Sequence, residues 1–238
     1  MRLVKDWRLA LSTLRRYPHM LPWIVDYLDH RGGDQTSLKD GVPWITYRAR
    51  SWLRRYLRPD MHGFEWGAGG STIYLAARMA RLVTIEHDGA WLERVRQALA
   101  SRGLSHQCEL RYVPPDRVAR PRTTAAADSE EGRKPGLYRS SMPGYEDADF
   151  REYCYAIDRA GCADFDLVLV DGRARLGCLH RARERVRPGG VVVLDNSERA
   201  AYETAGVVLG VGWAAERLSG PAPYGAGVMS TTIWRRVH

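Results

Sequence analysis

Two acidic side chains and a run of glycines have the spacing of a nucleoside-binding site. The segment FEWGAGGST (64–72) lies where a short apolar run gives way to a helical pattern, and its glycines let the backbone turn sharply and a ligand approach it. Glu86 ends the next apolar run, 21 residues after Glu65. In a doubly wound sheet, an acid at the end of the second strand accepts hydrogen bonds from a ribose diol at a spacing of about 20 residues. Together the two features indicate a bound nucleoside, whereas a glycine turn or a surface acid alone would not.

The loop sequence discriminates between nucleosides. Thr72 stands where the dinucleotide fingerprint G-x-G-x-x-G has its third glycine, and Glu65 places a carboxylate where a pyrophosphate would lie. A negative charge there suits S-adenosylmethionine, which carries a sulfonium and an ammonium group, better than NAD. We therefore expect S-adenosylmethionine as the cofactor, bound by Glu65, Gly67, Ala68, Gly69, Ser71, Thr72, Glu86, His87 and Asp171.

A second set of polar side chains follows two later apolar runs. Asp171 ends FDLVLVD (165–171), and Asp195 and Asn196 end VVVLDN (191–196). The strands expected here are neighbours whose carboxyl ends face one crevice. Three oxygen side chains at that edge predict a site for Mg²⁺ or another divalent cation, which would lower the pKa of an acceptor hydroxyl. The alternative is that the two aspartates cap helices or bind acceptor hydroxyls directly, and Asp171 is the expected catalytic residue.

The elements that would position these residues alternate along the chain. Short apolar runs separated by helical patterns indicate a parallel sheet covered by helices on both faces. Residues 212–218 and 229–235 flank a Gly/Pro turn and predict a closing hairpin. The expected fold is α/β: a Rossmann-like, doubly wound, mostly parallel seven-stranded sheet with an antiparallel C-terminal hairpin and N-terminal helices. The other expected strands cover 63–66, 82–87, 108–113, 165–171 and 191–196, the helices cover 72–80, 90–101, 150–160 and 176–186, and a turn covers 188–190.

Two segments lie outside this alternation. Residues 1–42 predict an N-terminal helical extension, because apolar residues recur there at helical spacing, interrupted by prolines. Residues 43–238 then form the cofactor-binding domain. Within it, residues 114–147 are rich in Pro, Arg, Ala and Gly and lack periodicity, so we expect an insertion that closes as a lid, with a disordered insertion as the alternative. The side chains expected to close over an acceptor are Tyr138, Arg139 and Tyr145.

Composition limits the class of protein. No apolar stretch approaches the roughly 18 residues of a membrane span, and the four cysteines form no C-x-x-C pair, so we expect a cytoplasmic protein without a membrane partner. The net charge of +8 raises the question of a nucleic-acid partner. Only Lys5, Lys39 and Lys134 are lysines, and the arginines are spread along the chain, which favours a solvated basic surface over a nucleic-acid partner.

From about residue 43 onward, the chain resembles the class I S-adenosylmethionine-dependent methyltransferases. Glu65-x-Gly67-x-Gly69 is similar to their first motif, Glu86 to their ribose-binding acid, and PGGVVVLDN (188–196) to a later strand motif. The motifs PWITY (43–47), EWGAGGST (65–72), VTIEHD (83–88), VDGRAR (170–175) and LDNSER (194–199) together resemble a group of small bacterial O-methyltransferases.

The acidic residues at the strand ends are similar to the metal site of catechol and caffeoyl-CoA O-methyltransferases. Those enzymes have a lysine, regarded as the base, three residues after the first aspartate. This chain has Ala174 there, flanked by Arg173 and Arg175, and arginine stays protonated. The departure weakens the inference of a metal and of a base at that position.

The resemblance implies transfer of a methyl group to a hydroxyl of a small acceptor such as a sugar, a glycan or a natural product. Such a reaction is accelerated chiefly by alignment and by exclusion of water. Two alternatives stay open: an RNA or protein methyltransferase, suggested by the basic charge, and a cofactor-binding protein without catalysis. VDGRAR (170–175) lacks the N-P-P-Y type of signature expected for methylation of base amines. A homodimer is compatible with the sequence.

Overall fold

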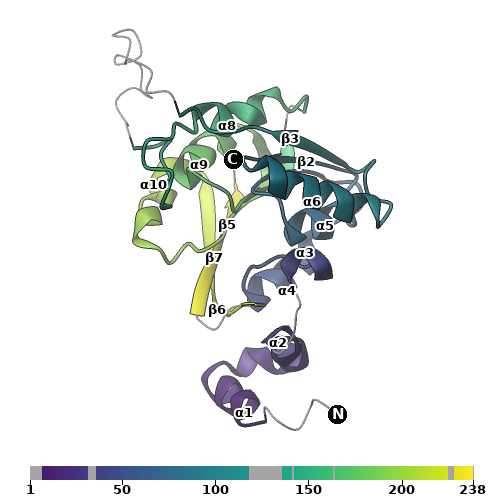
Figure 1. The fold of residues 1–238 in the computed structure, drawn as a ribbon. Coiled ribbons are helices and arrows are strands. Elements are labelled where there is room, and N and C mark those ends of the chain that lie inside the picture. Colours follow the sequence, from purple (N-terminus) through teal and green to yellow (C-terminus); the bar gives the residue numbers. More distant parts are fainter. Residues whose placement is uncertain are drawn as a thin grey trace.

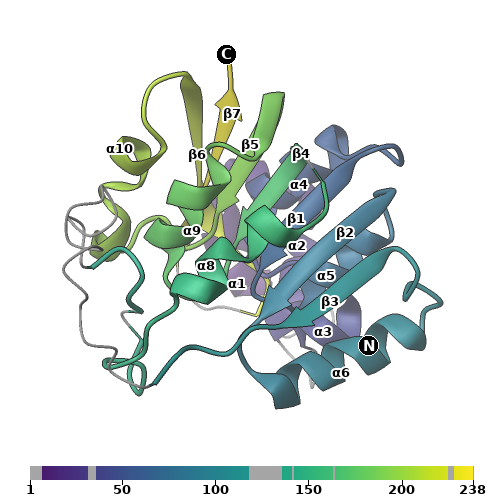
Figure 2. The same ribbon diagram turned by 90° about the horizontal axis from the view of Figure 1, so that it is seen from above.

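A mixed sheet forms the centre of the computed structural model, which describes residues 7–31, 36–117, 136–140, 142–162, 164–224 and 228–237. The seven strands have the order β3-β2-β1-β4-β5-β7-β6 (Figures 1 and 2). The first five pair in parallel, and β7 pairs antiparallel with both β5 and β6. The predicted fold is therefore confirmed. The strands are β1 (His62–Trp66), β2 (Arg81–Glu86), β3 (Cys108–Tyr112), β4 (Phe165–Val170), β5 (Val186–Leu194), β6 (Trp213–Pro221) and β7 (Val228–Arg236).

Helices cover both faces of the sheet, and the residues of β4 show how the two cores are divided. Val168 and Val170 are buried on the face covered by α8 and α9. Leu167 and Leu169, which alternate with them, are buried on the face covered by α4, α5 and α6. Burying each such side chain contributes about 1.5–3 kcal/mol. The helices are α4 (Tyr47–Tyr56), α5 (Gly70–Ala76), α6 (Gly89–Ala100), α8 (Arg151–Tyr155), α9 (Arg175–Ala182) and α10 (Ala205–Leu209).

Three local boundaries differ from the sequence prediction. The turn expected at 188–190 lies inside β5, where the register between β4 and β5 shifts and Gly189 adopts a φ of +78°. An irregularity of this kind absorbs a proline and two glycines without ending the strand. The helix expected over 150–160 is α8 followed by a 3-10 turn at Ala156–Arg159, and α9 ends at Ala182 instead of residue 186.

The N-terminal helices pack at one end of the sheet domain (Figure 1). They are α1 (Trp7–Arg16), a 3-10 helix at Pro18–Trp23, α2 (Ile24–Arg31) and α3 (Ser37–Asp40). Met20 and Tyr27 form a small core with Tyr47, the first residue of α4. Thr46 caps α4 and donates a hydrogen bond to the carbonyl of Leu218 in β6, which attaches this region to the sheet. The division between residues 42 and 43 stays a prediction.

None of the helices in the described part of the chain has both the length and the apolar character needed to cross a membrane.

Candidate active site

The glycine loop between β1 and α5 allows three segments of backbone to meet. Gly67 has a φ of +94°, and a Cβ atom there would lie 2.7 Å from the backbone nitrogen of Gly172, just after β4. A Cβ atom on Gly70 would overlap the carbonyl oxygen of Ser37 in α3. Only glycine combines the left-handed conformation with this close approach. The carboxyl ends of β1 and β4, where helices leave the sheet on opposite faces, therefore meet at Gly67 and Gly172.

Glu65 lies fully buried beneath the loop. Its Oε2 accepts hydrogen bonds from Thr72 Oγ1 at 2.6 Å and from Thr84 Oγ1 at 2.9 Å, and Thr72 Oγ1 in turn accepts one from the Gly69 nitrogen at 2.9 Å. Its Oε1 is buried and makes no hydrogen bond within the described residues. Burial raises the pKa of Glu65 to about 7. A nearby positive charge on a ligand would stabilise this carboxylate, so the residue fits the expected cationic cofactor.

Glu86 joins the glycine loop to the start of α6. Its Oε2 accepts a hydrogen bond from the Ala68 nitrogen at 2.9 Å, and its Oε1 accepts bonds from the nitrogens of His87 and Asp88 at 2.7 and 2.9 Å. The Nδ1 atom of His87 lies 2.6 Å from the same oxygen. A carboxylate has about four acceptor positions, so Glu86 is placed where the sequence predicted but already has several partners. Its role toward a ribose stays a prediction.

A cavity of about 430 Å³ opens above the loop, and we call it the glycine-loop cavity. Five of the predicted cofactor residues line it: Gly67, Ala68, Gly69, Ser71 and Asp171. The other four, Glu65, Thr72, Glu86 and His87, do not line it, and the first three of them are buried. Seven further lining residues were not among the predicted cofactor residues, and all but Gly70 come from other parts of the chain: Thr36, Ser37, Leu38, Trp44, Gly70, Trp91 and Tyr224.

Two aromatic contacts hold that wall in place. The indole nitrogen of Trp91 donates a hydrogen bond to the Ala68 carbonyl at 2.7 Å. The hydroxyl of Tyr224, beyond β6, donates to Asp40 Oδ2 at 2.7 Å and so connects the hairpin to α3. The ring of Tyr224 also packs edge-on against Trp44. No local pattern in the sequence links these residues, which are separated by up to 184 positions.

A buried guanidinium occupies the edge where a metal was expected. The Nη2 of Arg175 donates to Asp171 Oδ1 at 2.8 Å and to the Asp171 carbonyl at 2.9 Å. Its Nη1 donates to the Asp195 carbonyl at 2.5 Å, and its Nε to the Gly172 carbonyl at 3.1 Å. Arg175 therefore joins the ends of β4 and β5, which is the place a bridging cation would take.

The aspartates themselves do not fit a divalent ion. Asp171 is paired with Arg175, and Asp195 Oδ1 accepts a hydrogen bond from Thr231 in β7 at 2.8 Å. Burial, and then the nearby charge of Asp171, raise the pKa of Asp195 to about 8. Asn196 lies at a backbone φ of +49°. No group of three or more His, Cys, Asp or Glu side chains in the described part of the chain could hold a metal. The expected Mg²⁺ site at Asp171, Asp195 and Asn196 therefore lacks support.

The predicted lid falls largely on residues 118–135 and 141, which lie outside the described residues. Of the side chains expected to close over an acceptor, Tyr138 is buried in the core instead, because Leu137 and Tyr138 pack against α8 and α9. Tyr145 packs on His87, with its hydroxyl 3.1 Å from Nε2. Arg139 lines a second cavity, described below.

Comparison with known proteins gives the fold a class. The sequence matches no protein-family model and no curated protein. Among solved structures, it is similar to the O-methyltransferase TomG from Streptomyces achromogenes, which is involved in tomaymycin synthesis and was solved with S-adenosylmethionine (TM-score 0.55, 19% identity, 87% of this chain and 92% of that one). It is also similar to a candidate O-methyltransferase from Klebsiella pneumoniae (0.55, 15%, 97% and 97%) and to an rRNA methylase from Streptococcus thermophilus (0.54, 11%, 81% and 96%). The chain thus has the fold of the class I S-adenosylmethionine-dependent methyltransferases.

Proposed function

We propose that the chain is an S-adenosylmethionine-dependent methyltransferase that methylates a hydroxyl group of a small acceptor. The glycine-loop cavity carries the proposal. Its floor is bare backbone at Gly67 and Gly69, so a ligand can approach the main chain there. The buried carboxylates of Glu65 and Glu86 lie behind this floor, and together they suit a positively charged nucleoside.

Three acidic side chains have proposed roles in the transfer of the methyl group. S-adenosylmethionine, when bound, supplies a methyl group on a sulfonium, which an acceptor oxygen takes as the carbon–sulfur bond breaks and its electron pair stays on sulfur. In this proposal Glu86 accepts hydrogen bonds from the ribose hydroxyls, and Glu65 stabilises the positive charge of the cofactor. Asp171 lines the cavity and is the proposed acceptor of the hydroxyl proton: burial raises the pKa of its carboxyl above the ordinary value, which strengthens it as a base, and the pairing with Arg175 offsets part of that rise.

The similar solved structures provide evidence on the type of methyl acceptor. One structural neighbour is named an O-methyltransferase and another is a candidate for the same activity, which supports the hydroxyl acceptor. A third neighbour acts on rRNA, so an RNA substrate is the alternative that an experiment has to separate.

Calorimetry tests the cofactor assignment. S-adenosylmethionine and S-adenosylhomocysteine are expected to bind the full chain, and Glu86→Ala is expected to weaken binding at least about tenfold, since each hydrogen bond to a charged acceptor contributes about 1.5–3 kcal/mol. Glu86→Gln keeps the size of the side chain but removes its charge, and Glu93→Ala, an exposed residue on α6, is the matched control that leaves affinity unchanged. Unchanged affinity in both Glu86 variants would remove the assignment.

Transfer of a radiolabelled methyl group tests the reaction. The protein is incubated with labelled S-adenosylmethionine and, separately, with a pool of hydroxylated small molecules, total RNA and a protein extract. Label in the small-molecule fraction is the expected result. Label in RNA or protein would replace the proposed acceptor, and cofactor binding without transfer to any fraction would favour a non-catalytic protein.

A further inference from the structure

A second cavity lies beside the first and is lined by arginines. It has a volume of about 210 Å³, and we call it the arginine cavity. Its walls come from the segment before α8, from the turn between β4 and α9, and from the segment after β5. The lining residues are Gly136, Leu137, Arg139, Ser140, Met142, Gly172, Arg173, Ala174, Arg175, Leu176, Arg199, Ala201 and Tyr202.

The two cavities adjoin at the end of β4. Asp171 lines the glycine-loop cavity, and the next residue, Gly172, lines the arginine cavity. At this point Gly67 and Gly172 approach each other closely, since a Cβ atom on Gly67 would lie 2.7 Å from the Gly172 nitrogen. A molecule seated in the arginine cavity therefore lies next to the carboxylate that we propose as the proton acceptor.

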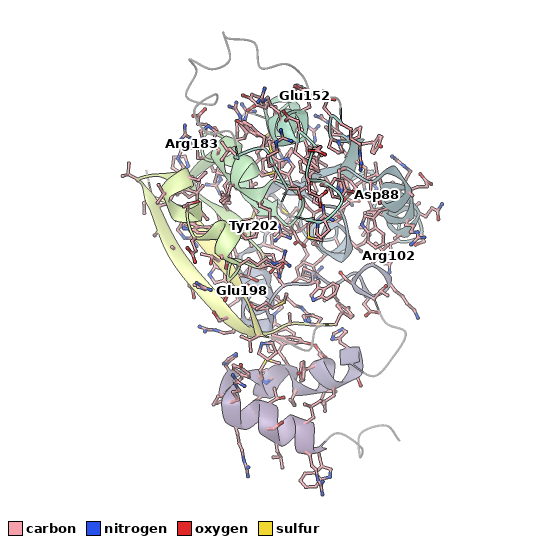
Figure 3. All side chains as sticks on the ribbon, turned by 60° about the vertical axis from the view of Figure 1, so that its left-hand side comes forward. Asp88, Arg102, Glu152, Arg183, Glu198 and Tyr202 are labelled. Carbon is pink, nitrogen blue, oxygen red and sulfur yellow. The ribbon has the colours of Figure 1, made fainter. Side chains whose placement is uncertain are left out.

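The positive charge in this cavity is not balanced by its own lining. Arg139, Arg173, Arg175 and Arg199 contribute four guanidiniums, and none of the described lining residues is acidic. Asp171 pairs with Arg175. Glu198 precedes Arg199, but its carboxylate accepts a hydrogen bond from the Ser230 nitrogen in β7 at 2.7 Å. Glu198 and Tyr202, from the segment after β5, are both labelled in Figure 3.

Three of the arginines have no ion-pair partner among the described residues. Arg139 reaches only backbone carbonyls, of Glu146 and Ala148, at 3.4 Å. The guanidinium of Arg173 lies over the ring of Tyr145, and its Nε is buried without a hydrogen bond. Arg199 is exposed.

The arginines lie close enough to Asp171, the proposed proton acceptor, for their charges to affect its pKa. Burial raises the pKa of Asp171 above its ordinary value, and the positive charges of Arg175, Arg199 and Arg173 offset part of that rise. Among the described residues Asp171 forms an ion pair with Arg175 only, so the other arginines leave the cavity with an excess of positive charge.

The backbone adds to this field. Ala174 precedes α9 in the left-handed conformation and provides no side-chain cap, and the first residues of the helix, Arg175 and Leu176, line the cavity. The amino end of a helix carries partial positive charge. With a volume of about 210 Å³, the cavity has room for one acidic group on a small carbon skeleton.

We infer that the arginine cavity binds an oxyanion, a carboxylate or a phosphate, carried by the methyl acceptor, so that the acceptor is an anionic hydroxylated small molecule. The planar fork of a guanidinium matches both groups through paired hydrogen bonds. The inference rests on the proposed function for the identity of the bound molecule as acceptor, whereas anion binding by the cavity can be measured without methyl transfer.

Calorimetric titration of the full chain tests the inference with defined probes: inorganic phosphate, 4-hydroxybenzoate and its neutral analogue 4-hydroxybenzamide. The acid is expected to bind at least about tenfold more tightly than the amide, because the amide lacks the charge-assisted bonds. The double variant Arg173→Gln/Arg199→Gln is expected to lose this preference and phosphate binding. Arg94→Gln, an exposed arginine on α6, is the matched control that keeps both.

The outcomes separate the inference from the proposed function. Equal affinity for acid and amide, or a preference that survives the double variant, overturns the inference. Displacement of phosphate by a short RNA that is sensitive to the same two substitutions overturns it in favour of a polynucleotide surface. Anion binding in a protein that fails to bind S-adenosylmethionine leaves the oxyanion site standing and removes the proposed function instead.

Discussion

Arg175 and Asp171 form an ion pair at the end of β4, with Nη2 of the arginine 2.8 Å from Oδ1 of the aspartate. The same guanidinium reaches the Asp195 carbonyl at the end of β5. A positive side chain is thereby fixed between the two strands that flank the site, and it is buried to all but 5% of its surface.

Removing this guanidinium is expected to destabilise the fold. Arg175→Met leaves the Asp171 carboxylate and three carbonyls without their donor, and loss of one partner of a buried pair costs about 3 kcal/mol or more. Urea denaturation followed by circular dichroism measures the change. Arg159→Met breaks an exposed pair with Glu152 and is the control, expected to cost less than about 1 kcal/mol. Equal losses of stability in the two variants would mean that Arg175 does not hold the ends of β4 and β5 together.

Chelation is expected to leave methyl transfer unchanged. The positive charge between β4 and β5 belongs to Arg175, which pairs with Asp171 and reaches the Asp195 carbonyl, so we expect that EDTA removes no ion from this place. The measurement is turnover in EDTA compared with turnover in added Mg²⁺ or Mn²⁺. Activity that disappears in EDTA and returns with either ion would restore the metal site that the sequence predicted.

Stability is expected to fall as the pH rises from about 4 to about 8. The pKa of Asp195 is raised to about 8 in the folded chain, above its ordinary value of 3.8, so in this range the unfolded chain releases a proton that the folded chain keeps. The contribution of Asp195 is fully present below the unfolded pKa and is lost as the pH passes the folded pKa. Asp195→Asn keeps an acceptor for Thr231 and should flatten this dependence in urea titrations at several pH values. If the slope of stability against pH is identical in variant and parent, the pH dependence comes from other groups, such as Glu65, whose pKa is raised to about 7.

Two glycines of the same loop are expected to respond differently to alanine. Gly67→Ala puts a Cβ 2.7 Å from the Gly172 nitrogen at a left-handed φ and should destabilise the fold by about 1–3 kcal/mol. A Cβ on Gly69 meets nothing within 4 Å, and its φ of 176° suits any residue, so Gly69→Ala should change stability by about 0.5 kcal/mol at most. Because Gly69 lines the cavity, that variant should still weaken cofactor binding. Thermal unfolding and calorimetry of the pair separate the two effects, and similar stability losses at both positions would contradict the assignment.

Local spacing explains why much of the fold and part of the site could be predicted. Apolar runs, glycines and the distance from Glu65 to Glu86 are properties of short stretches, and the structure places both acids at the glycine loop. The role of Arg175 could not be read in this way. Its position in VDGRAR (170–175) looks exposed and polar, and its burial depends on the Asp195 carbonyl, 20 residues away in the next strand.

The contact between Trp44 and Tyr224 in the cavity wall could not be predicted from the sequence for a related reason. Trp44 and Tyr224 meet only because α3 and the hairpin are brought together across the sheet. The start of β5 was misplaced because a proline and two glycines usually end a strand, whereas here the shift in register with β4 accommodates them. In each case, the deciding contact joins residues that no periodic pattern connects.

The strand order β5-β7-β6 has a consequence for the order of assembly. β6 is at the edge of the sheet and pairs with β7 alone, so it has no place in the sheet until the strand that follows it in the chain has been inserted. Thr231, which holds Asp195, belongs to that inserted strand. During synthesis, the five parallel strands can therefore pair first, whereas the surroundings of Asp195 are completed only after β7 has left the ribosome.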